Sequence, residues 1–127
     1  MTGKSSRARA ERAVQIATAI GSATRLQLLQ IMQKPPRHLA KPEETSEHGV
    51  CLVLLARAAG VAHTTATRHL KILVDCGLCE KTFVRHAGNG YTYYRRDDES
   101  IAAAIDLLAQ HLVTRSAPPS RSMSTAR

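Results

Sequence analysis

Aromatic residues are scarce in this sequence, which has no tryptophan, one phenylalanine and three tyrosines. All four lie in one short stretch, between positions 83 and 94. The helices predicted elsewhere in the chain must therefore pack through aliphatic side chains. The sequence also lacks any apolar run of the roughly eighteen residues that a membrane-spanning helix requires. We therefore expect neither a membrane span nor a membrane partner.

Cysteines are few and odd in number, at Cys51, Cys76 and Cys79. The basic N-terminal residues lack the apolar segment of a secretory signal. An odd count without an export signal argues against a disulfide scaffold, so we expect a cytoplasmic protein with reduced thiols. The sequence also has no phosphate-binding loop, no paired-carboxylate cleft and no nucleophile beside a base. We therefore predict that the protein is not an enzyme and has no catalytic residues.

Acidic residues are outnumbered, with 10 Asp and Glu against 18 Lys and Arg among 127 residues, for a formal net charge of +8. A chain of this length usually forms one domain. A basic excess of this size favours a polyanionic partner, either nucleic acid or an anionic membrane surface.

The hydrophobic pattern predicts one ordered domain over residues 12–114, between disordered tails at 1–11 and 115–127. Apolar spacing, caps and turn residues predict its elements in order: helices from Arg12, from an N-cap at Ser22, over 50–59 and over 63–76, a β-hairpin around Asn89-Gly90, and a helix over 98–113. Residues 34–49 are predicted to form a surface loop. The order α-α-α-α-β-β-α, mostly α with a small β-hairpin (α+β), is that of a winged helix-turn-helix.

Apolar stripes predict which side chains of these helices are buried. They are Leu26, Leu29 and Met32 in the second helix, Leu52, Leu55, Ala56 and Ala59 in the third, and Ala66, Leu70 and Leu73 in the fourth. Gly60 and Gly77 are predicted to end the third and fourth helices.

Burial of the fourth helix on one side fixes its outward face, which we predict to bind DNA. The candidate residues on this helix are His63, Thr64, Thr65, Thr67, Arg68 and Lys71. Arg68 can read a guanine edge, the threonines can bond phosphates or touch a thymine methyl, and Lys71 supplies a charge for phosphate. At the hairpin tip, Arg85, His86, Asn89 and Gly90 could reach an adjacent minor groove or the backbone.

Two blander interpretations compete with DNA binding. Exposed Arg and Lys side chains on a helix are often only solvated. Winged helices also serve as protein-interaction modules, although such modules have less reason to concentrate positive charge on one helix and a hairpin.

The stretches SATRLQLLQIM, LARAAGVAHTTATRHLKILVDCGLCEK and GYTYYRRDDE, in this order and spacing, resemble the ArsR family of bacterial winged-helix repressors. The likeness covers residues 13–114. It implies a homodimer built on the first and last helices, near 13–20 and 98–113, that binds an operator palindrome and is released by an effector. The family often has serine where Ala62 stands, so we expect Thr64 or Thr65 to cap the recognition helix instead.

The resemblance also indicates where metal ligands would lie. Cys51 matches the first cysteine of a C-x-C metal site, but Val53 replaces the second. Asp98 and His111 match two ligands of a zinc site on the last helix, where Ser100 and Thr114 replace the others. Two ligands from each chain of a dimer would make a weak zinc site. We prefer to interpret His111 as a polar interface residue.

Cys76 and Cys79 lie where the recognition helix meets the wing. Thiolates select soft ions, so they could bind a soft metal or metalloid such as arsenite or cadmium as an effector, with Cys51 as a third ligand. Alternatives are a disulfide or persulfide switch, or packing cysteines in an effector-free regulator. A thioredoxin-type activity is disfavoured, because that motif opens a helix whereas this one closes a helix. No cofactor is required by any of these hypotheses.

Overall fold

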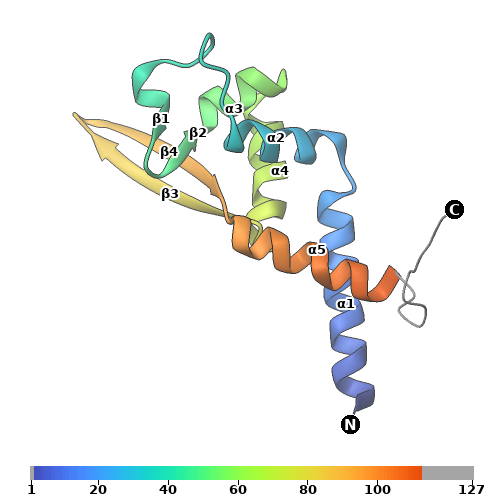
Figure 1. Cartoon of the computed structure of the whole chain (residues 1–127). Helices are drawn as coiled ribbons and strands as arrows, with labels where there is room; N and C mark the ends of the chain where they lie inside the picture. The colour runs from blue at the N-terminus through green and yellow to red at the C-terminus, as the bar shows by residue number, and fades with distance from the viewer. Residues whose placement is uncertain (1, 113–127) are drawn as a thin grey trace, which may run out of the picture.

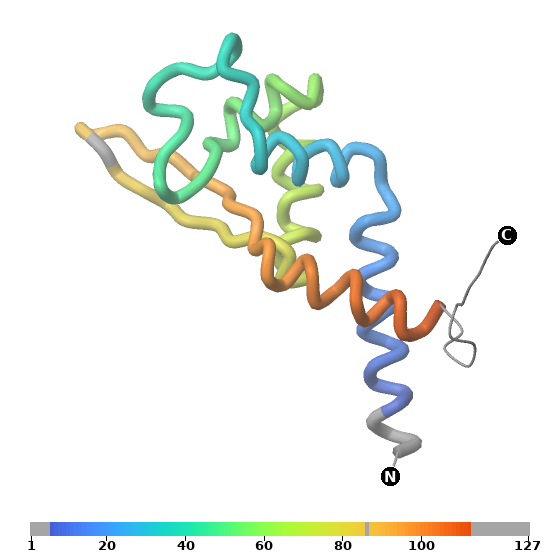
Figure 2. Tube along the Cα trace, viewed as in Figure 1, coloured from blue at the N-terminus to red at the C-terminus, as the bar shows by residue number. Residues whose placement is uncertain are grey.

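The computed structural model describes residues 2–112 and has the winged helix-turn-helix fold that the sequence predicted (Figure 1). Its elements, in order, are α1 (Thr2–Ile20), α2 (Ala23–Gln33), the 3-10 helix η1 (Pro42–Glu44), β1 (Thr45–Ser46), β2 (Gly49–Cys51), α3 (Leu52–Ala59), α4 (His63–Asp75), β3 (Cys79–His86), β4 (Asn89–Arg96) and α5 (Asp98–Leu112). The β3–β4 hairpin projects from the helical body, and α5 crosses α1 (Figure 2). No helix within residues 2–112 is long and apolar enough to cross a membrane.

Helix α1 begins at Thr2, so the expectation of a disordered tail over residues 1–11 is wrong from Thr2 onward. Two side-chain contacts within this stretch support the helix. Arg7 pairs with Glu11 one turn later at 3.2 Å, and Arg9 donates a hydrogen bond of 2.8 Å to Gln110 on α5. An ion pair between residues four positions apart, such as Arg7 and Glu11, stabilises a helix modestly. The contact of Arg9 with Gln110 joins distant parts of the chain and could not be predicted from local sequence. The predicted tail at 115–127 lies outside the described residues.

Helix α2 starts where predicted, because the hydroxyl of Ser22 accepts a hydrogen bond from the backbone N–H of Arg25 at 3.2 Å. The predicted apolar stripe is wrong at Leu26, which is 52% exposed. Leu28, which the stripe omitted, is fully buried. Both faces of this helix carry leucine, so periodicity alone could not choose between them.

The predicted loop over 34–49 contains η1, β1 and the first residue of β2, which the sequence analysis missed. Strand β2 pairs with β4, opposing Val50 to Tyr94, and extends the hairpin to a four-stranded antiparallel sheet of order β1-β2-β4-β3. Strands of two or three residues carry little local signal, and the pairing of residues more than forty positions apart depends on the tertiary fold.

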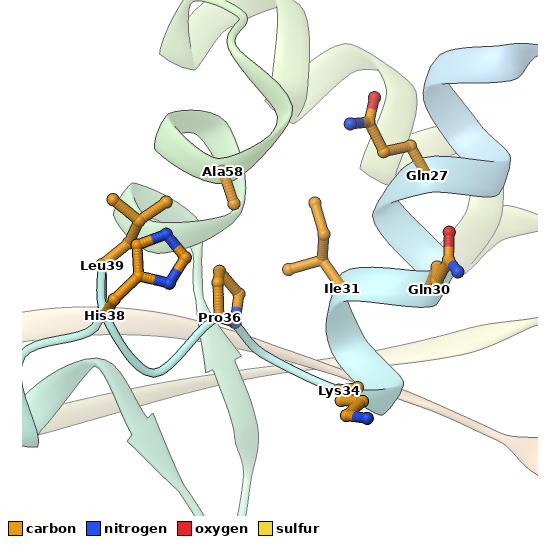
Figure 3. A pocket seen from close by; sticks show the side chains of 8 residues that line it. All are labelled: Gln27, Gln30, Ile31, Lys34, Pro36, His38, Leu39 and Ala58. Atoms are coloured by element: carbon orange, nitrogen blue, oxygen red, sulfur yellow. The ribbon is translucent and has the colours of Figure 1, made fainter.

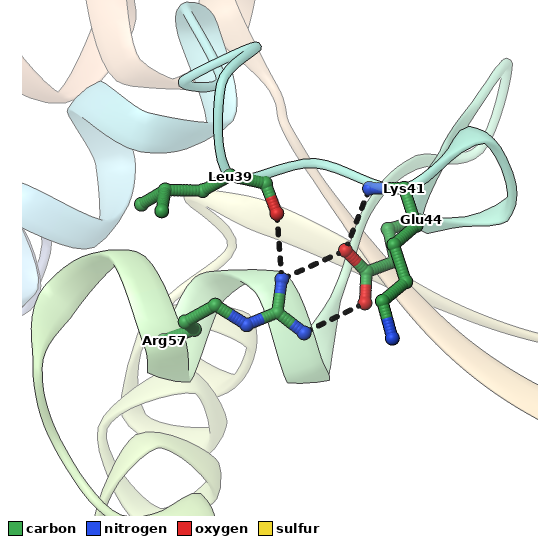
Figure 4. Close-up of polar contacts among 4 residues, drawn as sticks. All are labelled: Leu39, Lys41, Glu44 and Arg57. Carbon is green, nitrogen blue, oxygen red and sulfur yellow. Dashed lines mark hydrogen bonds and ion pairs between the residues drawn. The ribbon is translucent and has the colours of Figure 1, made fainter.

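A buried ion pair anchors this segment to α3 (Figure 4). Glu44 is 4% exposed and accepts two hydrogen bonds of 2.9 Å from the guanidinium of Arg57 and one of 3.0 Å from the backbone N–H of Lys41. Arg57 also donates to the carbonyl of Leu39 at 2.8 Å. The Arg57 hydrogen bonds lower the pKa of Glu44 from 4.5 to about 2 despite its burial.

The core between the helices is aliphatic, as predicted, with Tyr94 joining it from the sheet. Its largest fully buried side chains are Ile16, Leu28, Leu54, Leu55, Leu70, Leu73 and Leu78. The stripe predicted for the third helix holds for Leu55 and Ala56, whereas Leu52 and Ala59 are half-buried and the fully buried Leu54 was missed. Gly60 ends α3 with a φ of 71°, and Gly77 follows α4 with a φ of 82°, as the glycine positions predicted.

The hairpin is confirmed, but its turn lies two residues before the predicted Asn89-Gly90. His86 pairs with Asn89, so Ala87 and Gly88 form the two-residue turn, with φ values of 52° and 85°. Positive φ at both turn positions is typical of a type I′ turn. The preferred residues of such a turn are Asn-Gly, which is why the sequence predicted it at Asn89-Gly90. In the observed register Tyr94, which is buried in the core, is opposite Lys81.

Candidate nucleic-acid interface

Helix α4 is buried on one side and open on the other. Ala66, Leu70 and Leu73 are 0% exposed, as predicted. The opposite side carries the predicted DNA-binding residues, of which Thr65 is half-buried and the others are exposed: His63, Thr64, Thr67, Arg68 and Lys71. Four of the five exposed residues lie in the first two turns, which is where a recognition helix places its base-reading side chains.

The start of α4 differs from expectation. Ala62 is the N-cap residue, and no side chain accepts a hydrogen bond from the first turn. The prediction that Thr64 or Thr65 would replace the family's serine cap is therefore wrong. The helix itself supplies the reason, since both threonines lie within its first turn rather than before it.

The outward side chains of α4 differ in how they are held. The hydroxyl of Thr67 donates to the carbonyl of His63 at 2.8 Å, and Lys71 pairs with Asp75 at 2.9 Å in a well-exposed ion pair. Within residues 2–112, Arg68 makes neither a hydrogen bond nor an ion pair. Its five guanidinium donors are thus available for a guanine edge or a phosphate.

A polar contact behind α4 fixes its position against α1. Arg25 donates to the carbonyls of Thr18 and Ala19 at the end of α1 and contacts Nδ1 of His69 at 2.9 Å. Burial, with the nearby charges of Arg25 and Arg68, lowers the pKa of His69, so its ring is neutral and Nδ1 can accept. His69 is thus a polar packing residue, as predicted.

The wing carries a second group of candidate residues. Arg85 and Asn89 are exposed near the tip, and the guanidinium of Arg85 lies 5.9 Å from the centre of the Phe83 ring, itself 59% exposed. Only the backbone of His86 is described. Arg68 and Lys71 on α4 and Arg85 on the wing are thus all exposed.

The structure does not gather the three cysteines into one site. Cys51 lies opposite Tyr93 on β2, and Cys79 lies opposite Arg96 on β3, so they belong to opposite faces of the sheet. Within residues 2–112 there is no group of three His, Cys, Asp or Glu residues that could hold a metal ion.

The thiols of this chain are all buried. Burial, with a smaller contribution from Glu80, raises the pKa of Cys79 to about 12, so Cys79 is not a reactive thiolate. Cys76 has a different setting. Its sulfur lies 3.5 Å from a guanidinium nitrogen of Arg12, and its carbonyl accepts a 2.7 Å hydrogen bond from the same group.

The two candidate zinc ligands on α5, Asp98 and His111, lie near opposite ends of the helix. Asp98 is at the first position of the helix and pairs with Arg96 at 2.7 Å, whereas His111 lies near the other end and contacts the carbonyl of Leu107 at 3.1 Å. Ser100 lies in the first turn with Asp98, and Thr114 lies outside the described residues.

A hollow of about 420 Å³ lies between the end of α2, the following loop and Ala58 of α3 (Figure 3). Its polar lining is Gln27, Gln30, Lys34 and His38, and no residue of α4 or the wing contributes to it. It is therefore separate from the candidate residues on α4 and the wing.

Sequence reasoning missed Arg12 and Arg25, the two arginines that tie α1 to α4. Arg25 belongs to the stretch SATRL and Arg12 to the first turns of the predicted domain, yet neither position signals its partner. The contacts span 64 residues from Arg12 to Cys76 and 44 from Arg25 to His69. Only the tertiary structure reveals them.

Known proteins that are similar to this chain include the following three. The uncharacterized HTH-type transcriptional regulator YbzH of Bacillus subtilis is 32% identical over 97 residues, which cover 75% of this chain and 93% of YbzH. The homodimeric winged helix-turn-helix DNA-binding domain of Mb0332 from Mycobacterium bovis, a possible ArsR-family regulator, superposes with a TM-score of 0.53 at 23% identity, covering 85% of this chain and 87% of that one. NolR from Sinorhizobium fredii superposes with a TM-score of 0.54 at 17% identity, covering 91% and 97%. No family model matches the chain.

Proposed function

Because this chain belongs to the winged helix-turn-helix transcriptional regulators, we propose that it is a homodimeric repressor of the ArsR type that binds a palindromic operator and is released by a thiol-reactive effector. The observation that carries DNA binding is the open face of α4, where the side chains of His63, Thr64 and Arg68 are exposed. The net charge of +8 supports the same partner.

The dimer is supported by apolar side chains that α1 and α5 leave exposed. Val14 of α1 is 64% exposed, and Ile105 and Leu112 of α5 are 58% and 79% exposed. Of the fifteen residues of α5, only Ala104 is fully buried. An amphipathic helix with its apolar residues open to solvent normally packs against another surface. A second copy supplies that surface and gives the two recognition helices that a palindrome requires.

The effector is proposed to act through Cys76. The thiol lies at the end of α4, next to Arg12 of α1, and beside a hollow of about 290 Å³ lined by Gln15, Thr18, Ala19, Ile72, Asp75 and Cys76. Modification of this sulfur, by a soft metal ion, a metalloid or a persulfide, would separate Arg12 from the C-terminal end of α4. Because α1 is also a proposed dimer helix, this change would alter the spacing of the two recognition helices.

The DNA-binding role is tested with Arg68→Ala. We expect operator affinity to fall about 10- to 100-fold, since a bidentate contact to a guanine contributes about 1–3 kcal/mol. The measurement is fluorescence anisotropy with a duplex recovered by selection from a random library. Arg37→Ala, which removes an equal charge from the loop after α2, is the matched control and should bind within about twofold of the original protein. If both variants lost operator affinity equally, Arg68 would contribute only its charge and no specific contact.

The effector role is tested by titrating the protein–operator complex with arsenite, cadmium, zinc and a persulfide donor. We expect at least one thiol-reactive agent to release the operator from the unmodified protein but not from Cys76→Ser. Cys79→Ser is the control, because its buried, high-pKa thiol should leave release unchanged. Absence of release by every agent would favour an effector-free regulator with packing cysteines.

A further inference from the structure

A hollow of about 270 Å³ lies between the outer side of α4 and the root of the wing. Its lining residues are Thr67, Lys71, Val74, Asp75, Lys81 and Tyr94. Lys81 of β3 and Tyr94 of β4 are direct partners in the sheet, so their side chains project from the same face toward α4. The hollow thus joins the two parts of the proposed DNA-binding surface.

Among the residues that line this hollow, Tyr94 has an unusual hydroxyl. The side chain is 2% exposed, and within residues 2–112 its hydroxyl makes no hydrogen bond. The neighbouring Tyr93 shows the ordinary arrangement, since its hydroxyl donates to the carbonyl of Glu43. A buried hydroxyl without a partner is unfavourable, which makes Tyr94 a donor available to a ligand in the hollow. Burial raises the pKa of Tyr94, so the hydroxyl keeps the proton that it would donate.

The charges around the hollow favour an anion. Lys81 is exposed and, within the described chain, makes no ion pair. Lys71 is held by Asp75 at 2.9 Å, but both side chains are mostly exposed, at 74% and 60%, so the pair is weak and can be exchanged for another anion. Two ammonium groups and one hydroxyl donor therefore face one carboxylate.

The path of DNA across this surface identifies the anion. If α4 enters the major groove and the hairpin reaches the adjacent minor groove, the sugar-phosphate strand that separates the two grooves must pass between them. The hollow lies between α4 and the hairpin, the two elements that would flank this strand. We propose that it binds one phosphate of this strand, with Lys81 and Lys71 as charged partners and the Tyr94 hydroxyl as donor. This inference rests on the proposed function.

Asp75 gives the proposal a distinctive consequence. Its carboxylate repels a phosphate in the hollow and competes with it for Lys71. Asp75→Asn should therefore tighten DNA binding by about threefold, whereas most substitutions at an interface weaken it.

The test is a salt titration of duplex binding by anisotropy with Lys81→Gln and Tyr94→Phe. Lys81→Gln should weaken binding to selected and unrelated duplexes alike by about three- to tenfold and lower the salt slope by about one. Tyr94→Phe removes only an oxygen and should weaken binding about threefold without lowering the melting temperature. Lys34→Gln controls for charge. Tyr93→Phe, which breaks the bond to Glu43, should lower the melting temperature instead of affinity.

Replacing single phosphates of the duplex by neutral methylphosphonates then locates the contact. One position should weaken binding of the original protein and have no further effect on the double variant Lys81→Gln/Tyr94→Phe. The proposal is overturned if both single variants bind as the original does while Arg68→Ala does not, and the proposed function would then stand. If the original protein bound no duplex at all, both this proposal and the proposed function would be overturned. Competition by inorganic phosphate at matched ionic strength, with no sensitive position in the duplex, would assign the hollow to free phosphate and overturn the backbone contact.

Discussion

Replacing Arg57 by alanine is expected to lower the free energy of unfolding by about 1–3 kcal/mol, because it leaves the buried carboxylate of Glu44 without two of its hydrogen bonds. Glu44 has a side chain only 6% exposed and depends on Arg57 for two of its three hydrogen bonds. A loss of this size is a large part of the 5–15 kcal/mol, roughly, that stabilises a domain. The measurement is equilibrium unfolding in urea near neutral pH, followed by far-ultraviolet circular dichroism.

The matched control is Arg7→Ala, which breaks an ion pair whose side chains are 79% and 66% exposed. Exposed pairs contribute little, so this variant should change the free energy of unfolding by less than about 0.5 kcal/mol. Equal effects of the two substitutions would mean that the Arg57–Glu44 pair does not anchor the segment before α3.

The acid dependence of stability provides a second signature of the same pair. The pKa of Glu44 is about 2 in the folded protein and 4.5 ordinarily, so the ionised group adds stability that is fully present above about pH 4.5 and is lost as the pH falls toward 2. In Arg57→Ala the pKa of Glu44 rises. The difference in stability between the two proteins should therefore narrow between pH 4.5 and 2, and a constant difference would contradict the assignment.

Replacing Ile105 by glutamate is expected to separate the proposed dimer into monomers. Ile105 is 58% exposed on α5, so within one protomer its substitution disturbs little packing, whereas a charge buried between two copies is strongly unfavourable. Sedimentation velocity should give the 13.8 kDa mass of one chain instead of twice that value. Operator affinity should fall about 100-fold or more, because two linked half-site contacts become independent.

Leu26→Glu is the control for the dimer variant. Leu26 is 52% exposed on α2, outside the two proposed dimer helices, and the variant should keep the mass of the original protein. A monomeric mass for the unsubstituted protein at micromolar concentration would remove the basis of the dimer proposal. Loss of the dimer in Leu26→Glu, with Ile105→Glu unchanged, would move the interface to α2.

Local chemistry was sufficient to predict α2 and the helix-turn-helix of α3 and α4. Ser22 caps α2, Gly60 allows the turn before α4, and Ala66, Leu70 and Leu73 fix which side of α4 faces outward. The outward set followed directly from that burial. Prediction was weaker where two local solutions compete, as in the hairpin turn, which lies at Ala87-Gly88 instead of Asn89-Gly90. Only the pairing of the two strands in the structure shows which turn is used.

Contacts between distant residues could not be predicted. The pairing of β2 with β4, the Arg57–Glu44 ion pair within the predicted loop and the approach of Arg12 to Cys76 all depend on the assembled fold. The placement of Cys51 and Cys79 on opposite faces of the sheet also depends on the assembled fold. The hollow between α4 and the wing likewise brings together residues that are distant in the sequence, such as Lys71 and Tyr94.

The central claim is that the open face of α4 and the wing together form the DNA-binding surface. Amide chemical-shift mapping of the isotope-labelled protein, titrated with a duplex selected from a random library, tests it most directly. The account predicts that the largest shifts fall in residues 63–71 of α4 and 81–92 of the wing. Shifts concentrated instead around the hollow between α2 and the loop at 34–39, with α4 and the wing unchanged, would contradict it.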